Sequence, residues 1–113
     1  MFIDKYKEED GWYIDNEGIA YESPEDILGD KLGFCGCGNT QAALSYVALI
    51  LQSIKDKKRI SSLFQSEGQM YTMYYYLTDK GMLEHGVSVP GWLTQQGEEM
   101  LSDINELLLQ QGN

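Results

Sequence analysis

The first third of the chain combines short runs of β-prone residues with polar turn residues. Trp12–Ile14 and residues 19–21 are rich in aromatic and β-branched side chains and flank the segment "DNEG", whose Asn and Gly supply turn geometry. Ser23 precedes Pro24 as a helix N-cap precedes a proline in the first turn. This pattern predicts an antiparallel hairpin followed by a short helix over residues 24–30.

Helical periodicity dominates the middle of the chain. Over residues 40–55 apolar side chains recur every three or four positions, which predicts a central, largely buried helix capped by Asn39 or Thr40. Its apolar positions are Ala43, Leu44, Val47, Ala48, Ile50, Leu51 and Ile54. The segment "KDKKR" follows at the C-terminal end, where the helix dipole favours positive charge. A structural role therefore explains this basic cluster as well as ligand binding does.

Four more elements are predicted after this helix. Residues 60–64 suit a short helix and "QSEG" a turn, and helical spacing over 69–80 ends at Gly81, which suits a left-handed helix stop. "MLEHGVSV" and "GWLT" suit two short strands joined by a loop. Thr94 then begins a last helix with a leucine-rich side, over residues 94–110.

Length and composition place these elements in one domain. A chain of 113 residues with 42% hydrophobic residues can build one core and is ordinary for a globular protein. We predict a single α+β domain over 1–113, mostly helical, with a hairpin and short-helix extension over 1–34 and a helical core over 39–110. Because no apolar run is long enough for a bilayer and the start lacks a signal-peptide profile, we expect a cytoplasmic protein without membrane contact.

The net charge of −10 is concentrated near the N-terminus. Residues 1–30 hold ten Asp and Glu against two Lys, whereas the basic cluster spans residues 55–59. Such a balance disfavours non-specific nucleic-acid binding, which depends on Lys and Arg neutralising phosphates. It suits a protein that meets a basic partner, or one that its charge merely keeps soluble. We predict a partner-binding surface that includes Glu22, Glu25, Asp26 and Asp30.

Two motifs resemble the winged helix-turn-helix superfamily, most closely the MarR and PadR groups of bacterial regulators. They are "DKGML", where a recognition helix enters the first wing strand, and "WLTQQGEEML", where the second wing strand enters the next helix. The resemblance covers residues 41–108. It implies a winged-helix-like core with a recognition helix at 69–80, a wing at 84–91, and a C-terminal helix that pairs two subunits.

The chain is also similar to small uncharacterised proteins of bacteriophages and prophages. The segment "FCGCG" upstream of a long helix and "LEHG" with "GWLT" downstream carry this second resemblance. It implies an accessory protein that acts on a protein of the host or the phage, and it supplies no catalytic residues.

The predicted recognition helix supports two interpretations. As a dimeric regulator on duplex DNA, the domain would use Gln69, Thr72, Tyr76, Lys80, Lys57, Lys58 and Arg59. Yet the helix has one lysine and the wing has no Arg or Lys, so few side chains suit base edges and phosphates. Its tyrosines instead suit protein recognition. We therefore predict a protein-interaction module whose surface includes Tyr71, Tyr75 and Tyr76, and keep the DNA-binding regulator as the alternative.

The segment "GFCGCGN" raises a third hypothesis. A zinc site would use Cys35, Cys37 and His85, which is one ligand short of the usual four, and "CGC" is shorter than the usual knuckle. A reactive thiol, a phosphate loop and plain free thiols in a glycine turn are the alternatives. We predict no cofactor and keep a zinc- or thiol-dependent module as the last candidate. With one histidine and no nucleophile-elbow pattern, we assign no catalytic residue and predict that the protein is not an enzyme.

Overall fold

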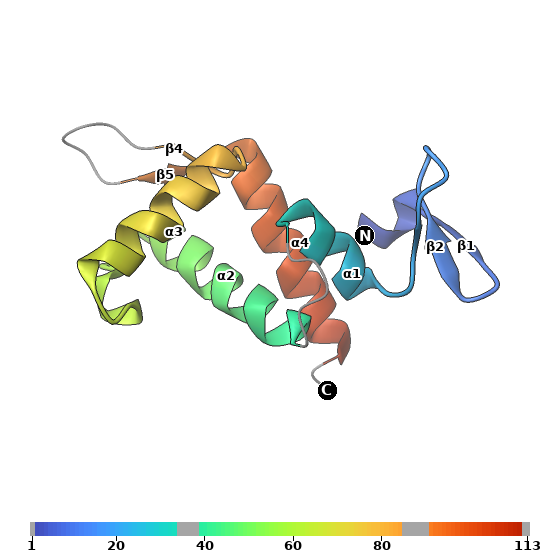
Figure 1. Cartoon of the computed structure of the whole chain (residues 1–113), viewed down its shortest axis with the longest axis horizontal. Coiled ribbons are helices and arrows are strands. Elements are labelled where there is room, and N and C mark those ends of the chain that lie inside the picture. Colours follow the sequence, from blue (N-terminus) through green and yellow to red (C-terminus); the bar gives the residue numbers. More distant parts are fainter. Residues whose placement is uncertain (1, 34–38, 85–90, 112–113) are drawn as a thin grey trace. The chain divides into compact units, whose positions relative to one another are not determined.

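The computed structural model describes residues 2–33, 39–84 and 91–111. This part of the chain is α+β and predominantly helical, with two small antiparallel sheets (Figure 1), which confirms the predicted fold class at that level. Contacts group the chain into two compact units: unit 1 comprises Met1–Ser45 with Asp103–Asn113, and unit 2 comprises Tyr46–Ser102. The prediction of one domain stays a prediction.

Unit 1 contains a three-stranded antiparallel sheet in the order β1 (Lys7–Glu9), β2 (Trp12–Ile14), β3 (Ala20–Tyr21). The β2–β3 hairpin confirms the prediction. Strand β1 was not predicted, because "KEE" carries no apolar alternation. Asp10 and Gly11 join β1 to β2 with φ angles of 52° and 85°, and two residues with positive φ are typical of the Asp-Gly hairpin turn.

Helix α1 (Pro24–Lys31) follows the sheet as predicted. The Ser23 side chain caps it by accepting a hydrogen bond of 3.3 Å from the Asp26 backbone N–H. The Tyr21 hydroxyl donates to the Asp30 carboxylate at 3.2 Å, which ties β3 to α1. The buried apolar side chains of unit 1 include one from the 3-10 helix η1 (Phe2–Lys5); they are Phe2, Ile27, Leu28, Leu32, Leu44, Ile104 and Leu107.

Helix α2 (Thr40–Lys55) begins where predicted, with the Asn39 side chain accepting from the Ala42 N–H at 3.2 Å. It ends in a Schellman motif, in which the Lys58 N–H donates to the Ser53 carbonyl at 2.8 Å and Lys57 has a φ of 58°. The predicted short helix is the single 3-10 turn η2 (Ser61–Leu63).

Helix α3 (Glu67–Asp79) begins two residues before the predicted start at residue 69. The predicted "QSEG" turn is wrong, because the Ser66 hydroxyl caps the helix by accepting from the Gln69 N–H at 3.2 Å. Gly81, with a φ of 76°, ends the helix as predicted. The antiparallel pair β4 (Leu83–Glu84) and β5 (Trp92–Leu93) confirms the predicted strands; most of the predicted wing, residues 85–90, lies outside the described residues.

Helix α4 (Gln95–Gln111) starts after Thr94, whose hydroxyl accepts from the Gly97 N–H at 3.1 Å and donates to the Gly81 carbonyl. Gly97 is buried, and a Cβ there would collide with the Met82 carbonyl. The buried apolar side chains of unit 2 are Val47, Ala48, Ile50, Leu51, Ile54, Ile60, Leu77, Met82, Leu83, Met100 and Leu101. Within the described ranges, no helix has the length and apolar character needed to cross a bilayer.

Candidate interaction surfaces

The predicted acidic residues lie on and beside α1 in unit 1. Glu22, Asp26 and Asp30 are exposed and Glu25 is half-buried. Asp26 and Asp30 are one helical turn apart and therefore share a side of α1. Glu25 and Asp26 occupy the first turn, where the helix dipole favours negative charge, so the fold supplies a second reason for these two acids.

Tyr21 links one carboxylate of this acidic region to the sheet of unit 1. Partial burial, the hydrogen bond to Asp30 and the negative charges of Asp30 and Asp15 raise the pKa of the Tyr21 phenol to about 12. The Tyr6 ring stacks edge-on against the Tyr21 ring, with centroids 6.2 Å apart, and burial with nearby carboxylates raises the pKa of Tyr6 as well. The Asp30 carboxylate is therefore held in place by an aromatic pair.

The acidic character of the chain belongs mainly to unit 1. Unit 1 carries twelve Asp and Glu against three Lys, whereas unit 2 carries six acids against five bases. Four of those five bases are the cluster at residues 55–59. The two units therefore differ strongly in charge, with unit 2 close to neutral.

The predicted tyrosines lie on α3 in unit 2, but on two different sides. Tyr71 and Tyr75 are one turn apart and are 52% and 64% exposed. Tyr76 is about 100° further around the helix axis than Tyr75. It is half-buried, burial raises the pKa of its hydroxyl, and the Lys80 Nζ lies 5.8 Å from its ring centroid. Of the three predicted tyrosines on α3, Tyr71 and Tyr75 are therefore the exposed pair.

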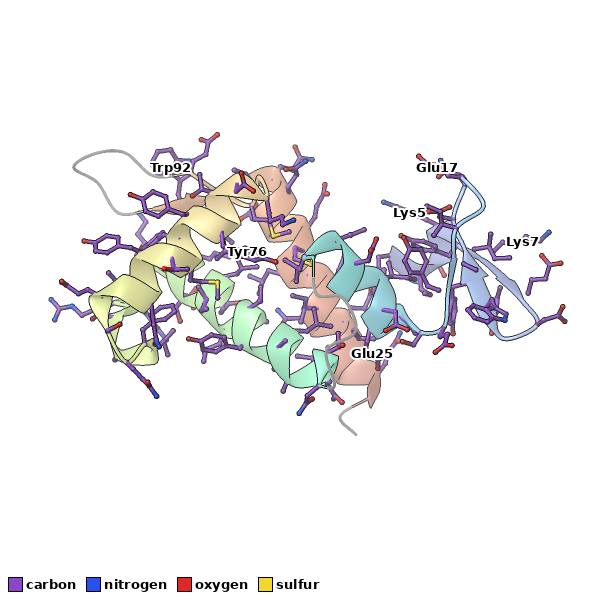
Figure 2. All side chains as sticks on the ribbon, viewed as in Figure 1. Lys5, Lys7, Glu17, Glu25, Tyr76 and Trp92 are labelled. Atoms are coloured by element: carbon purple, nitrogen blue, oxygen red, sulfur yellow. The ribbon has the colours of Figure 1, made fainter. Side chains whose placement is uncertain are left out.

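Unit 2 also contains a recess of about 700 Å³, which the sequence did not predict. Its lining residues come from the end of α2, the η2 region, α3 and the start of β5; they are Ile54, Lys57, Lys58, Arg59, Ile60, Ser61, Met70, Tyr74, Gly91 and Trp92. Trp92, the first residue of β5, is 46% exposed (Figure 2). Tyr74 is half-buried. Its burial is the larger cause, and the nearby Tyr71 the smaller cause, of a raised pKa of its hydroxyl.

The cations of this recess are available to a ligand. Lys55 pairs with Glu98 at 3.7 Å, but Lys57, Lys58 and Arg59 are exposed and form no ion pair with any residue that the structure describes. An apolar recess with a few charged groups at its edge is the usual form of a binding site. The sequence does not reveal this recess, because its residues come from separate segments. The cations follow α2, whereas Met70 and Tyr74 belong to the apolar spacing of α3.

The residues of the DNA-binding alternative do not form one surface, because the cations at 57–59 lie with a different side of α3 from the other four residues. Gln69, Thr72, Tyr76 and Lys80 share one side of the helix at three- and four-residue spacing. Met70 and Tyr74, which line the recess together with Lys57, Lys58 and Arg59, occupy another side. Of the four residues on the predicted reading side, Lys80 alone is a cation.

The candidate metal ligands Cys35, Cys37 and His85 lie outside the described residues. Within residues 2–33, 39–84 and 91–111, no group of three or more His, Cys, Asp and Glu is arranged to hold a metal ion. The zinc hypothesis therefore stays a prediction.

Comparison with known proteins gives the chain no relatives. None of the family models, curated proteins or solved structures that were compared with it matches.

Proposed function

We propose that the protein is a non-enzymatic interaction module that docks on a basic surface of a partner protein. The contact is made through the acidic face of unit 1, which comprises Glu22, Asp26 and Asp30 on and beside α1. The observation that carries this proposal is the concentration of twelve acids against three bases in that unit, with three of the acids exposed around α1. Charge held on ordered elements gives orientation as well as attraction, which favours a specific basic partner.

The exposed pair Tyr71 and Tyr75 supplies a second contact surface. Tyrosine combines a large apolar area with a polar tip and is enriched at protein interfaces. We place this partner in the host or the phage, which is what the resemblance of the segments "FCGCG", "LEHG" and "GWLT" implies.

The test is capture of proteins from a host lysate with the wild type and with the variant Glu22→Lys, Asp26→Lys, Asp30→Lys. We expect basic proteins to bind the wild type, and the purified partner to lose about tenfold or more in affinity for the variant, because opposed charges become like charges. The matched control is Glu67→Lys, Glu84→Lys, Glu99→Lys, which makes the same change in net charge on exposed residues of unit 2. Equal binding by the wild type and the acidic-face variant would overturn the proposal.

A winged-helix regulator is the second candidate. Its support is the order of elements α2, η2, α3, β4, β5 and α4, which is the order that the motif resemblance implies for residues 41–108, although η2 is only three residues long. In this candidate α4 pairs two subunits and α3 enters the major groove of DNA.

Fluorescence anisotropy of a labelled duplex across a salt series separates the two candidates. An interaction module leaves the anisotropy unchanged at low salt. Binding with a steep salt dependence, lost in Gln69→Ala, Thr72→Ala and in Lys58→Glu, Arg59→Glu, would favour the regulator.

A further inference from the structure

The sheet of unit 1 has an exposed apolar face. The registers Lys7↔Ile14, Glu9↔Trp12 and Ile14↔Ala20 place these five residues on one face, where Lys7 pairs with Glu9 at 3.5 Å. Trp12 is 43% exposed, Ala20 is exposed and Ile14 is half-buried. Together with Glu9 and Asp10 these residues line a hollow of about 410 Å³. The opposite face carries Tyr21, which bonds to α1.

This face is unlike the outer face of an ordinary antiparallel sheet. When one face packs on the rest of the unit, the outer face is normally polar. Here the outer face presents a tryptophan and an isoleucine, bordered by the Lys7–Glu9 ion pair and by Asp10 at the tight Asp10–Gly11 turn. A rimmed apolar patch of this kind marks an interaction surface.

The recess in unit 2 has the complementary character. Its walls include Ile54, Ile60, Met70, Tyr74 and Trp92, and its charged residues are cations. Lys57 is held in the left-handed region at φ 58°, where glycine is the favoured residue.

We propose that the outer sheet face of one copy packs into the unit 2 recess of a second copy. Trp12 meets the apolar walls, while Glu9 and Asp10 meet Lys58 and Arg59. The second copy is the favoured occupant because its sheet face is apolar and net acidic, with Glu9 and Asp10 against Lys7, and so matches the cationic, apolar recess. The contact joins two different surfaces, so it is heterologous and adds copies into a ring or an open chain. It does not depend on the proposed function, which uses the acids around α1.

The first test is sedimentation velocity over a wide concentration range at low and high salt. We expect the mass to grow with concentration and the growth to weaken in high salt, because oppositely charged rims meet. Trp12→Ala and the pair Lys58→Glu, Arg59→Glu should each weaken the association by about tenfold or more, since one removes the apolar anchor and the other reverses the rim. Leu49→Ala and the pair Lys5→Glu, Lys31→Glu, which alter an exposed apolar side chain and two exposed cations outside the recess and the hollow, are the matched controls.

The second test mixes the two defective variants. Each variant alone should be monomeric, because the Trp12→Ala protein lacks the anchor and the Lys58→Glu, Arg59→Glu protein lacks the recess. Their mixture should form a one-to-one dimer that grows no further, because one intact sheet face meets one intact recess. If Trp12→Ala fails to fold by circular dichroism, Glu9→Lys with Asp10→Asn replaces it, since asparagine retains the hairpin turn.

Three outcomes would overturn the proposal. The wild type could stay monomeric at every concentration, the mixture of variants could stay monomeric, or the association could survive both variants. The last outcome is the one expected of a symmetric dimer through α4.

Discussion

Lys57 illustrates how a single residue can oppose local stability. Its φ of 58° places it in the left-handed region, which is unfavourable for residues with a Cβ by roughly 1–2 kcal/mol. We expect Lys57→Gly to stabilise the protein by about 1 kcal/mol, because glycine adopts this conformation without a steric penalty. Thermal and urea unfolding measure the change.

The control for that prediction is Lys57→Ala. This variant removes the same charge but keeps the Cβ, so it should leave the free energy of unfolding nearly unchanged. Equal stabilisation by both variants would assign the effect to charge and contradict the conformational explanation.

Tyr21 supplies the prediction about pH. Its pKa is raised from the ordinary 10.0 to about 12, so the folded state favours the neutral phenol. The resulting stabilisation is fully present below pH 10 and is lost as the pH rises through about 12. Asp30→Asn should bring the Tyr21 pKa down, because it removes the negative charge that repels the tyrosinate and accepts a hydrogen bond from the neutral phenol.

The measurement is an ultraviolet titration of tyrosinate, with Tyr21→Phe used to isolate the contribution of this residue. Asp26→Asn is the control, since Asp26 is not among the causes of the Tyr21 shift. An identical Tyr21 titration in the wild type and in Asp30→Asn would contradict the assignment.

At the scale of elements, the first turn of α4 depends on a close approach to the backbone that precedes β4. Gly97 is buried, and an added Cβ would collide with the Met82 carbonyl, which is backbone and cannot rotate away. We expect Gly97→Ala to destabilise the protein by about 3 kcal/mol, because the helix start must shift. Chemical denaturation followed by circular dichroism tests this expectation.

Gly68 in α3 is the matched control. A Cβ at Gly68 would have only the Ser66 Oγ nearby, at 3.7 Å. Gly68→Ala should therefore stabilise the protein by roughly 0.5 kcal/mol, as alanine is the better helix former. Destabilisation of similar size in both variants would show that the close approach at Gly97 has no special importance.

At the scale of the whole molecule, the uneven charge has a thermodynamic consequence. Unit 1 carries twelve acids against three bases, so its folded state suffers repulsion among like charges. Moderate salt screens this repulsion, and we expect the melting temperature to rise between low and physiological ionic strength. Differential scanning calorimetry in sodium chloride measures it.

Glu8→Gln with Glu17→Gln provides the comparison for that measurement. Both residues are exposed, and losing their charge should reduce the salt dependence of the melting temperature. A melting temperature that falls with added salt would contradict the explanation by repulsion.

Local signals in the sequence account for most of the elements. The caps Ser23, Asn39 and Thr94 each accept a hydrogen bond from the backbone N–H three residues further on, and the helix stop at Gly81 depends on its own φ angle. Such interactions are complete within one turn, which is why the starts of α1, α2 and α4 and the end of α3 could be predicted. The misplaced start of α3 belongs to the same class, since Ser66 was a capping residue in a segment assigned to a turn.

The sequence by itself determined the helices, the β2–β3 hairpin, the β4–β5 pair and the acidity of the N-terminal segment. Only the tertiary structure decided that residues near positions 54–61, 70–74 and 91–92 line one recess, and that Tyr71 and Tyr75 are exposed while Tyr76 is half-buried. The physical reason is the distance along the chain over which each interaction acts. Capping and periodicity act over a few residues, whereas a recess forms where distant segments converge, and no local preference encodes that convergence.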